Sequence, residues 1–224
     1  MIYAFMRWLL RAIVYVYLGR LFHMEGRELV PRRGGLMVCA NHSSNVDPPM
    51  VPGFLPRSDS WSMAKAEWFR DIRGVIFRAY HAFPVVRHTA DRTAIRRALA
   101  ILRGGESLIM YPEGTRVREG GLKRAEPGAG FLALQSGVAV QSVALIGTRA
   151  IFPAGTTLPR RGPVELHFGA PFHLAKHRPD GRRVTNQEAS DAIMVRIAEL
   201  LPAEVRGEYA DLESWRQRLD GVWQ

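Results

Sequence analysis

Short apolar runs, each bounded by polar or turn-forming residues, recur along the chain from residue 36 onward. Runs of this length are typical of strands that are buried on both faces, so they predict six strands. The predicted strands cover residues 36–40, 74–77, 83–86, 107–111, 140–146 and 164–168. Helical patterns lie between them, and this alternation predicts an α/β fold: a single domain with a mixed, largely parallel central sheet flanked by helices.

Three helical patterns are clear enough to bound. The first runs from about residue 91 to 103, where charged and apolar positions alternate with helical spacing before two glycines. A shorter one covers residues 129–136. Thr185 and Glu188 have the spacing of a capping box, which predicts the start of a third helix, and Pro202 ends it.

The first 22 residues are apolar and aromatic but are interrupted by Arg7, Arg11 and Arg20. A bilayer span needs roughly 20 mostly uncharged residues, and the longest uncharged run, residues 12–19, is too short. The segment also lacks the order of a secretory signal. Aromatic residues with flanking arginines instead indicate a helix lying in the membrane interface, with guanidinium groups on lipid phosphates. A first helix that packs into the core is the alternative.

These patterns divide the chain into two parts. Residues 1–30 form an N-terminal helical membrane-associating segment, and residues 31–224 form the α/β domain. We therefore expect the protein at the cell membrane, as a peripheral or monotopic protein on the cytoplasmic face.

The net charge of +10 favours an anionic partner: a phosphate-bearing substrate, an anionic membrane surface or nucleic acid. No nucleic-acid reader motif is present, so no nucleic-acid partner is expected. The single cysteine, Cys39, excludes an intrachain disulfide, and the seven histidines have no metal-ligand spacing. No metal site is expected.

The first candidate for chemistry is the pair His42 and Asp47, directly after the apolar run 36–40. Histidine can take a proton near neutral pH when a carboxylate fixes its tautomer and stabilises the imidazolium. An ordinary helix start is the alternative, because an Asp followed by Pro48 can cap backbone N–H groups.

The second candidate is the stretch YPEGTR, residues 111–116, which follows another apolar strand. Arg116 can hold a phosphate group through two parallel hydrogen bonds. Glu113 can orient either that arginine or a neighbouring backbone group. A solvated turn with a surface ion pair is the alternative. Two further cations are weaker candidates: Arg87, at the end of a predicted strand, and Lys65, in a mostly apolar neighbourhood.

In combination these stretches resemble the phospholipid and glycerol acyltransferase family. NHSSNVD, residues 41–47, is similar to the family's block in which four residues separate a histidine from an aspartate. FPVVR resembles the second block with its arginine, and YPEGTR the third. The resemblance extends from about residue 35 to 174 and includes Lys65.

The resemblance implies transfer of an acyl chain from an acyl thioester to the free sn-2 hydroxyl of 1-acylglycerol-3-phosphate, forming phosphatidic acid in phospholipid biosynthesis. The co-substrate would be acyl-CoA or acyl-acyl carrier protein, and no other cofactor is expected. His42 would be the general base and Asp47 would hold its ring. The residues implied to bind substrate are Arg87, Glu113, Gly114, Thr115, Arg116 and Lys65.

Other functions stay open at this point. The acceptor could be glycerol-3-phosphate, a lyso-ornithine lipid or another lysophospholipid. A non-catalytic basic lipid-binding protein would also use the N-terminal helix and the arginines, but it would not need His42 and Asp47 at a strand end.

Overall fold

The computed structural model describes residues 1–224 except 87–90, 118, 153–155, 157 and 224. Within that part, seven strands form one sheet in the order β1-β7-β6-β2-β5-β3-β4. Every neighbouring pair is parallel except β6 and β7, which are antiparallel. The predicted mixed, largely parallel sheet is therefore confirmed. The strands are β1 (Phe22–Glu25), β2 (Leu36–Ala40), β3 (Ser60–Lys65), β4 (Ala82–Val85), β5 (Ser107–Met110), β6 (Ala139–Ile146) and β7 (Val164–Phe168).

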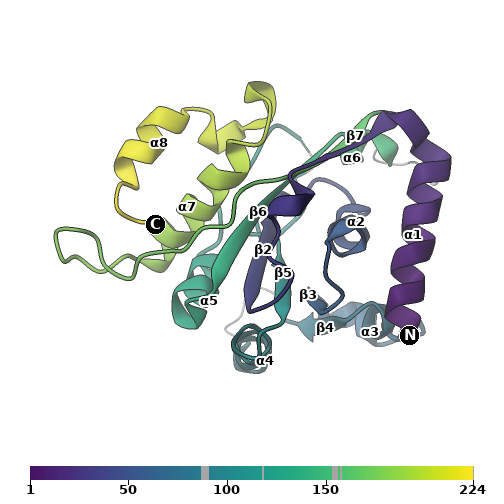
Figure 1. The fold of residues 1–224 in the computed structure, drawn as a ribbon, viewed down its shortest axis with the longest axis horizontal. Helices are drawn as coiled ribbons and strands as arrows, with labels where there is room; N and C mark the ends of the chain where they lie inside the picture. The colour runs from purple at the N-terminus through teal and green to yellow at the C-terminus, as the bar shows by residue number, and fades with distance from the viewer. Residues whose placement is uncertain (87–90, 118, 153–155, 157, 224) are drawn as a thin grey trace.

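Helices cover both faces of this sheet (Figure 1). One face carries α1 (Ile2–Leu18) and α2 (Asp47–Phe54), and the other carries α4 (Arg92–Arg103), α5 (Gly128–Ser136) and α7 (Asn186–Ala198). The remaining helices are short: α3 (Arg73–Ala79), α6 (Thr148–Ile151) and α8 (Leu212–Arg218), with the 3₁₀ turns η1 (Gly19–Leu21), η2 (Arg27–Leu29), η3 (Ala66–Phe69), η4 (Ala203–Val205) and η5 (Gly207–Tyr209).

The position of strand β2 in the middle of the sheet explains why its sequence is uninterruptedly apolar. Leu36, Val38 and Ala40 face the core beneath α1 and α2, whereas Met37 and Cys39 face the core beneath α4, α5 and α7. All five side chains are fully buried, and burial raises the pKa of the Cys39 thiol well above its usual range. A strand covered on both faces excludes water from every side chain, which favours apolar residues at successive positions.

The strand predicted at residues 74–77 is wrong, because these residues belong to helix α3. A short apolar run does not distinguish a strand from a helix. Here the run is apolar without being buried: Val75 and Ile76 are each 58% exposed. Strand β3 was not predicted, because serines interrupt it; the buried Ser60 accepts a hydrogen bond from the Ser107 hydroxyl on β5 at 2.8 Å.

Helix α1 lies along the domain and presents two different faces. Its inner face buries Tyr3, Val14 and Leu18. Arg7 and Arg11 also point inward, where they donate hydrogen bonds to backbone carbonyl groups at the C-terminal end of α2. These two guanidinium groups therefore lie on the inner face of α1, because α2 provides acceptors for them, and the expected contact with lipid phosphates stays a prediction.

Candidate active site

The site begins with two loops that follow neighbouring parallel strands. The loop after β2 leads to α2 on one face of the sheet, whereas the loop after β5 leads towards α5 on the opposite face. Loops that leave neighbouring parallel strands towards opposite faces leave a crevice at the carboxyl ends of the strands. Asn41 fixes the first loop to β6: its side-chain amide donates to Leu145 O at 2.9 Å and accepts the Leu145 N–H at 2.7 Å.

His42 and Asp47 contact each other directly. The His42 Nδ1 to Asp47 Oδ2 distance is 2.9 Å, and both side chains are buried. Because His42 Nδ1 is hydrogen-bonded to the Asp47 carboxylate, Nε2 is the ring nitrogen that remains available to a substrate in the adjoining cavity. The ring also lies against Tyr111, with ring centroids 4.4 Å apart. These contacts fix both the tautomer and the orientation of the imidazole.

Asp47 orients the loop as well as the ring. Its Oδ2 accepts the N–H groups of Ser43 at 2.7 Å and Ser44 at 2.6 Å, in addition to His42. Asp47 is the first residue of α2, but it caps no N–H group of that helix. Pro48 and Pro49 have no N–H to offer, and the Met50 N–H is donated to Val46 O at 3.1 Å. Asp47 therefore starts the helix without capping it, and its carboxylate is left for the histidine loop.

Glu113 connects the second loop to the first. Its Oε2 accepts the backbone N–H of His42 at 3.1 Å, so of the two roles expected for this carboxylate the backbone one is observed. Burial, opposed by that hydrogen bond and supported by the negative charge of Asp47, raises the pKa of Glu113 from 4.5 to about 8. The carboxyl group is therefore largely protonated at neutral pH.

Glu113→Gln is expected to change how stability depends on pH. In the wild type the folded state keeps a proton that the unfolded state loses, so the free energy of unfolding falls as pH rises between 4.5 and about 8, by about 1.4 kcal/mol per pH unit. Glutamine can accept the same N–H without titrating, so its profile lacks this fall. Urea unfolding across that pH range measures both profiles; parallel curves would show that Glu113 titrates normally.

A cavity of about 1000 Å³ opens beside His42. Arg116 lines it and donates a hydrogen bond to the Asn45 side chain, which joins the two loops. Arg149, which was not predicted, also lines it and donates to Val117 O and Gly120 O, both at 3.2 Å. Arg149 follows the carboxyl end of β6, so the strand-end rule that found the other loops could have found it.

The remaining predicted residues lie elsewhere. Gly114 and Thr115 are exposed at the tip of the second loop, outside the cavity lining. Gly114 has φ +69°, a conformation that favours glycine. Lys65 ends β3, also outside that lining, and pairs with Glu67 Oε1 at 3.3 Å. Arg87 lies outside the described residues.

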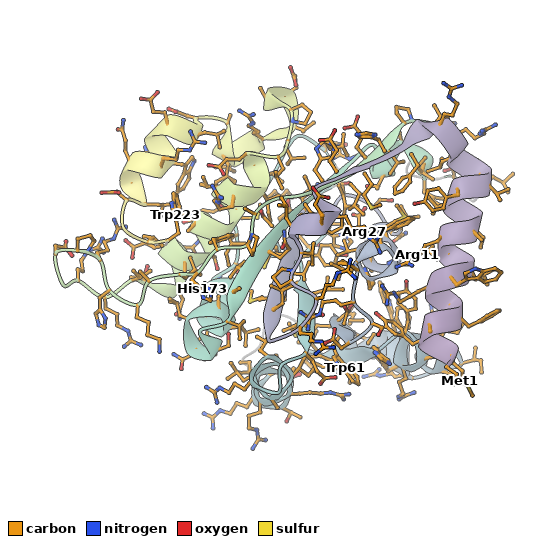
Figure 2. All side chains as sticks on the ribbon, in the orientation of Figure 1. Met1, Arg11, Arg27, Trp61, His173 and Trp223 are labelled. Carbon is orange, nitrogen blue, oxygen red and sulfur yellow. The ribbon has the colours of Figure 1, made fainter. Side chains whose placement is uncertain are left out.

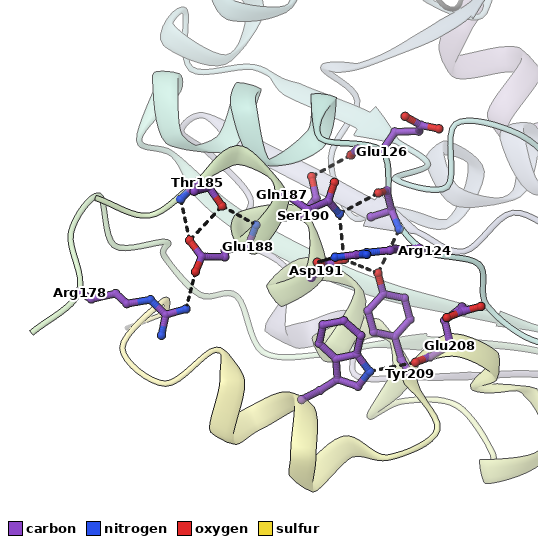
Figure 3. Close-up of polar contacts among 12 residues, drawn as sticks. Arg124, Glu126, Arg178, Thr185, Gln187, Glu188, Ser190, Asp191, Glu208 and Tyr209 are labelled. Carbon is purple, nitrogen blue, oxygen red and sulfur yellow. Dashed lines mark hydrogen bonds and ion pairs between the residues drawn. The ribbon is translucent and has the colours of Figure 1, made fainter. Parts of the chain in front are cut away.

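The segment that supplies Gly121 and Leu122 to the cavity lining is held by buried polar contacts that include Asp191 of α7 (Figure 3). Tyr209 donates to Asp191 Oδ1 at 2.7 Å and accepts the Ala125 N–H at 3.0 Å. This network fixes the segment that begins at Gly121, which lines the cavity. A Cβ at Gly121 would lie 2.3 Å from the Gly207 backbone nitrogen, so only glycine allows this close approach. Figure 3 also shows the Thr185–Glu188 capping box, as predicted.

The cavity is suited to an anion beside His42. The charged side chains of its lining among the described residues are Arg116 and Arg149, whereas the raised pKa of Glu113 favours its neutral form. No group of three or more His, Cys, Asp and Glu side chains in the described part of the chain could hold a metal ion.

Comparison with known proteins identifies the chain's relatives. An acyltransferase family model matches residues 21–146, a span that contains both loops. The chain belongs to the acyltransferase family. The resemblance inferred from the sequence blocks is thereby confirmed.

Two curated acyltransferases are similar over different lengths. A 1-acyl-sn-glycerol-3-phosphate acyltransferase from Bacillus subtilis is 31% identical over 185 residues, which cover 78% of this chain and 85% of the relative. The chloroplastic 1-acyl-sn-glycerol-3-phosphate acyltransferase LPAT1 of Arabidopsis thaliana is 35% identical over 83 residues, which cover 37% of this chain and 23% of the relative.

A crystal structure shares the fold. The 1-acyl-sn-glycerophosphate (LPA) acyltransferase PlsC from Thermotoga maritima superimposes with a TM-score of 0.65 at 24% identity, over 87% of this chain and 79% of that chain. The expected fold class, including the N-terminal apolar helix, agrees with this architecture.

Proposed function

We propose that this acyltransferase moves an acyl chain from an acyl thioester to the sn-2 hydroxyl of 1-acylglycerol-3-phosphate. The observation that carries the proposal is the buried His42–Asp47 pair beside a cavity lined by Arg116 and Arg149. A base beside two guanidinium groups suits an acceptor that has both a hydroxyl and a phosphate. The names of the relatives support the same acceptor.

In the proposed reaction His42 Nε2 takes the proton of the acceptor hydroxyl as its oxygen attacks the thioester carbonyl carbon. Asp47 stabilises the imidazolium that forms. When the tetrahedral intermediate collapses, the carbon–sulfur bond breaks and the imidazolium gives its proton to the thiolate. The products are the new ester and the free thiol, and no acyl-enzyme forms.

The negative oxygen of the intermediate needs hydrogen-bond donors. We propose that backbone N–H groups of residues 113–116 supply them. The Gly114 N–H is already donated to Tyr111 O at 3.0 Å, whereas Arg116 lies at the cavity. This geometry favours the Arg116 end of the loop over its glycine.

The cations of the cavity are proposed to hold the acceptor phosphate. Arg116 and Arg149 are placed for that role, and Arg87 and Lys65 stay predictions. The acyl donor, acyl-CoA or acyl carrier protein, is likewise a proposal, with the net charge of +10 favouring either anionic carrier.

An acceptor panel tests the function directly. With one labelled acyl-CoA we expect 1-acylglycerol-3-phosphate to be acylated with a higher kcat/KM than glycerol-3-phosphate, a lyso-ornithine lipid or lysophosphatidylcholine. Faster transfer to another acceptor would replace the substrate and keep the reaction. Absence of transfer to every acceptor from both acyl-CoA and acyl carrier protein would favour a lipid-binding protein.

We further propose that α1 docks the enzyme on the membrane, with the active site on the cytoplasmic face. By length and composition residues Ile2–Leu21 could cross a bilayer, but the inner face of α1 packs against the domain. Its outer face is uncharged and apolar. The exposed large side chains there are Met1, Ile2, Phe5, Trp8, Leu9, Ile13, Tyr15 and Val16. A helix with one face on protein and one apolar face outward suits the membrane interface.

Val16→Ser is expected to weaken partition onto liposomes by about tenfold, because it removes an apolar side chain that the membrane would bury. Val205→Ser is the control: it makes the same change at an exposed valine that lies on η4, beside the active-site cavity, and not on α1. A sedimentation assay with the full-length chain measures both. Equal partition of the two variants would contradict docking through α1.

A further inference from the structure

A second cavity, of about 400 Å³, lies near the amino ends of β2 and β5, whereas the active site lies at their carboxyl ends. It is bordered by the inner face of α1, the turn η2 and the segment between α2 and β3. Its lining consists of Arg7, Arg11, Arg27, Arg32, Leu55, Pro56, Arg57, Ser58 and Asp59. Five of these nine residues are arginines. Figure 2 shows Arg11 and Arg27 beside α2, which they approach from different segments of the chain.

Three of the arginines are held by the end of helix α2. Arg7 donates to Leu55 O, Arg11 Nε donates to Gly53 O at 2.6 Å, and Arg27 Nε donates to Phe54 O at 2.8 Å. These contacts fix the guanidinium groups around the cavity.

Backbone carbonyl groups accept hydrogen bonds from the guanidinium groups, but they do not neutralise the positive charge of the arginines. Asp59 is the single carboxylate in the lining, and Arg57 already binds it with two hydrogen bonds of 2.6 Å. The C-terminus of α2 adds only about half a negative charge. The cavity therefore has a large excess of positive charge.

The arginines also show unmet hydrogen bonding and mutual repulsion. Arg7 is only 6% exposed, and its Nε has no partner among the described residues. Burial and the positive charges of Arg7 and Arg27 lower the pKa of Arg11. The guanidinium of Arg32 is exposed at the rim and forms no hydrogen bond or ion pair within the described part of the chain. Capping of α2 accounts for three arginines but not for Arg32 or the unpartnered Nε.

We propose that this cavity binds a phosphate group. Guanidinium groups hold phosphate through paired, charge-assisted hydrogen bonds, and an anion would supply the missing negative charge. The phosphate could belong to a lipid headgroup, because Arg7 and Arg11 lie on the same helix as the exposed apolar face, or it could be a free phosphate ion. The site is separate from His42 and does not depend on the proposed reaction.

Calorimetric titration of the full-length chain distinguishes these sources. The ligands are short-chain phosphatidylglycerol, which is neither substrate nor product of the proposed reaction, inorganic phosphate, and short-chain diacylglycerol as the tail without phosphate. The variants are Arg32→Glu and Arg27→Gln. Arg33→Glu is the matched control, because it makes the same charge change at an exposed neighbour outside the cavity lining.

We expect Arg32→Glu and Arg27→Gln to weaken phosphatidylglycerol binding by about tenfold, Arg33→Glu to change it less than about twofold, and diacylglycerol not to bind. If inorganic phosphate binds as tightly and responds to the same variants, the site takes free phosphate. The proposal is overturned if the wild type binds neither phosphate ligand, or if Arg32→Glu and Arg33→Glu have equal effects. Arg32 is exposed, so its variant folds even if Arg27→Gln does not.

Discussion

His42→Ala is expected to lower kcat by roughly 10²- to 10⁴-fold, the usual contribution of a positioned general base. The ring nitrogen beside the cavity would be lost, while the loop would keep its backbone hydrogen bonds to Glu113 and Val117. Acyl transfer from labelled acyl-CoA measures the effect. Circular dichroism and thermal unfolding should show a folded variant.

Two controls make the His42 result specific. His173→Ala removes an exposed histidine outside the cavity lining and should retain wild-type kcat. Added imidazole should restore part of the activity of His42→Ala, because it can occupy the space of the missing ring. Full activity in a folded His42→Ala variant would remove the base from the mechanism.

Asp47→Asn is expected to lower kcat by roughly 10²- to 10⁴-fold with little change in KM, because the imidazolium loses the charge that stabilises it. Geometry should survive the change. Oδ2 accepts all three hydrogen bonds, whereas Oδ1 is buried without a partner among the described residues. The asparagine can place its side-chain oxygen where Oδ2 lies in the wild type and its NH₂ group where Oδ1 lies.

Asp47→Ala separates charge from structure. It leaves the ring Nδ1–H of His42 and the backbone N–H groups of Ser43 and Ser44 without their acceptor, at about 1–3 kcal/mol for each buried donor. We therefore expect a clear fall in Tm for Asp47→Ala and a small one for Asp47→Asn, measured by thermal unfolding. Equal kcat in Asp47→Asn and wild type would reduce Asp47 to a structural anchor of its loop.

The sequence predicts a strand best where both faces of that strand are buried. The uninterrupted apolar run of β2 follows from two covered faces, and the strand-end rule then places the His42 and Glu113 loops at the same end of the sheet. Helix α3 misleads because its apolar residues are exposed, so their composition does not report burial.

The sequence does not show partners that are distant along the chain. Arg7 and Arg11 stand in an apolar helix, which suggests that they face lipid headgroups, but their acceptors are carbonyl groups more than 40 positions later. Asp47 is different, because its partners lie only three to five positions before it. The local pattern allows either a helix cap or a partner for His42, and the structure shows the second.

The full burial of Cys39 makes the enzyme convenient for spectroscopic labelling. Its thiol is inaccessible and strongly disfavours the reactive thiolate. Maleimide probes should therefore ignore the native chain and react only with a cysteine introduced at a chosen surface position. A fluorophore placed in this way along the outer face of α1, read out with lipid-borne quenchers, would report how deep each turn sits in a bilayer without first removing any native thiol.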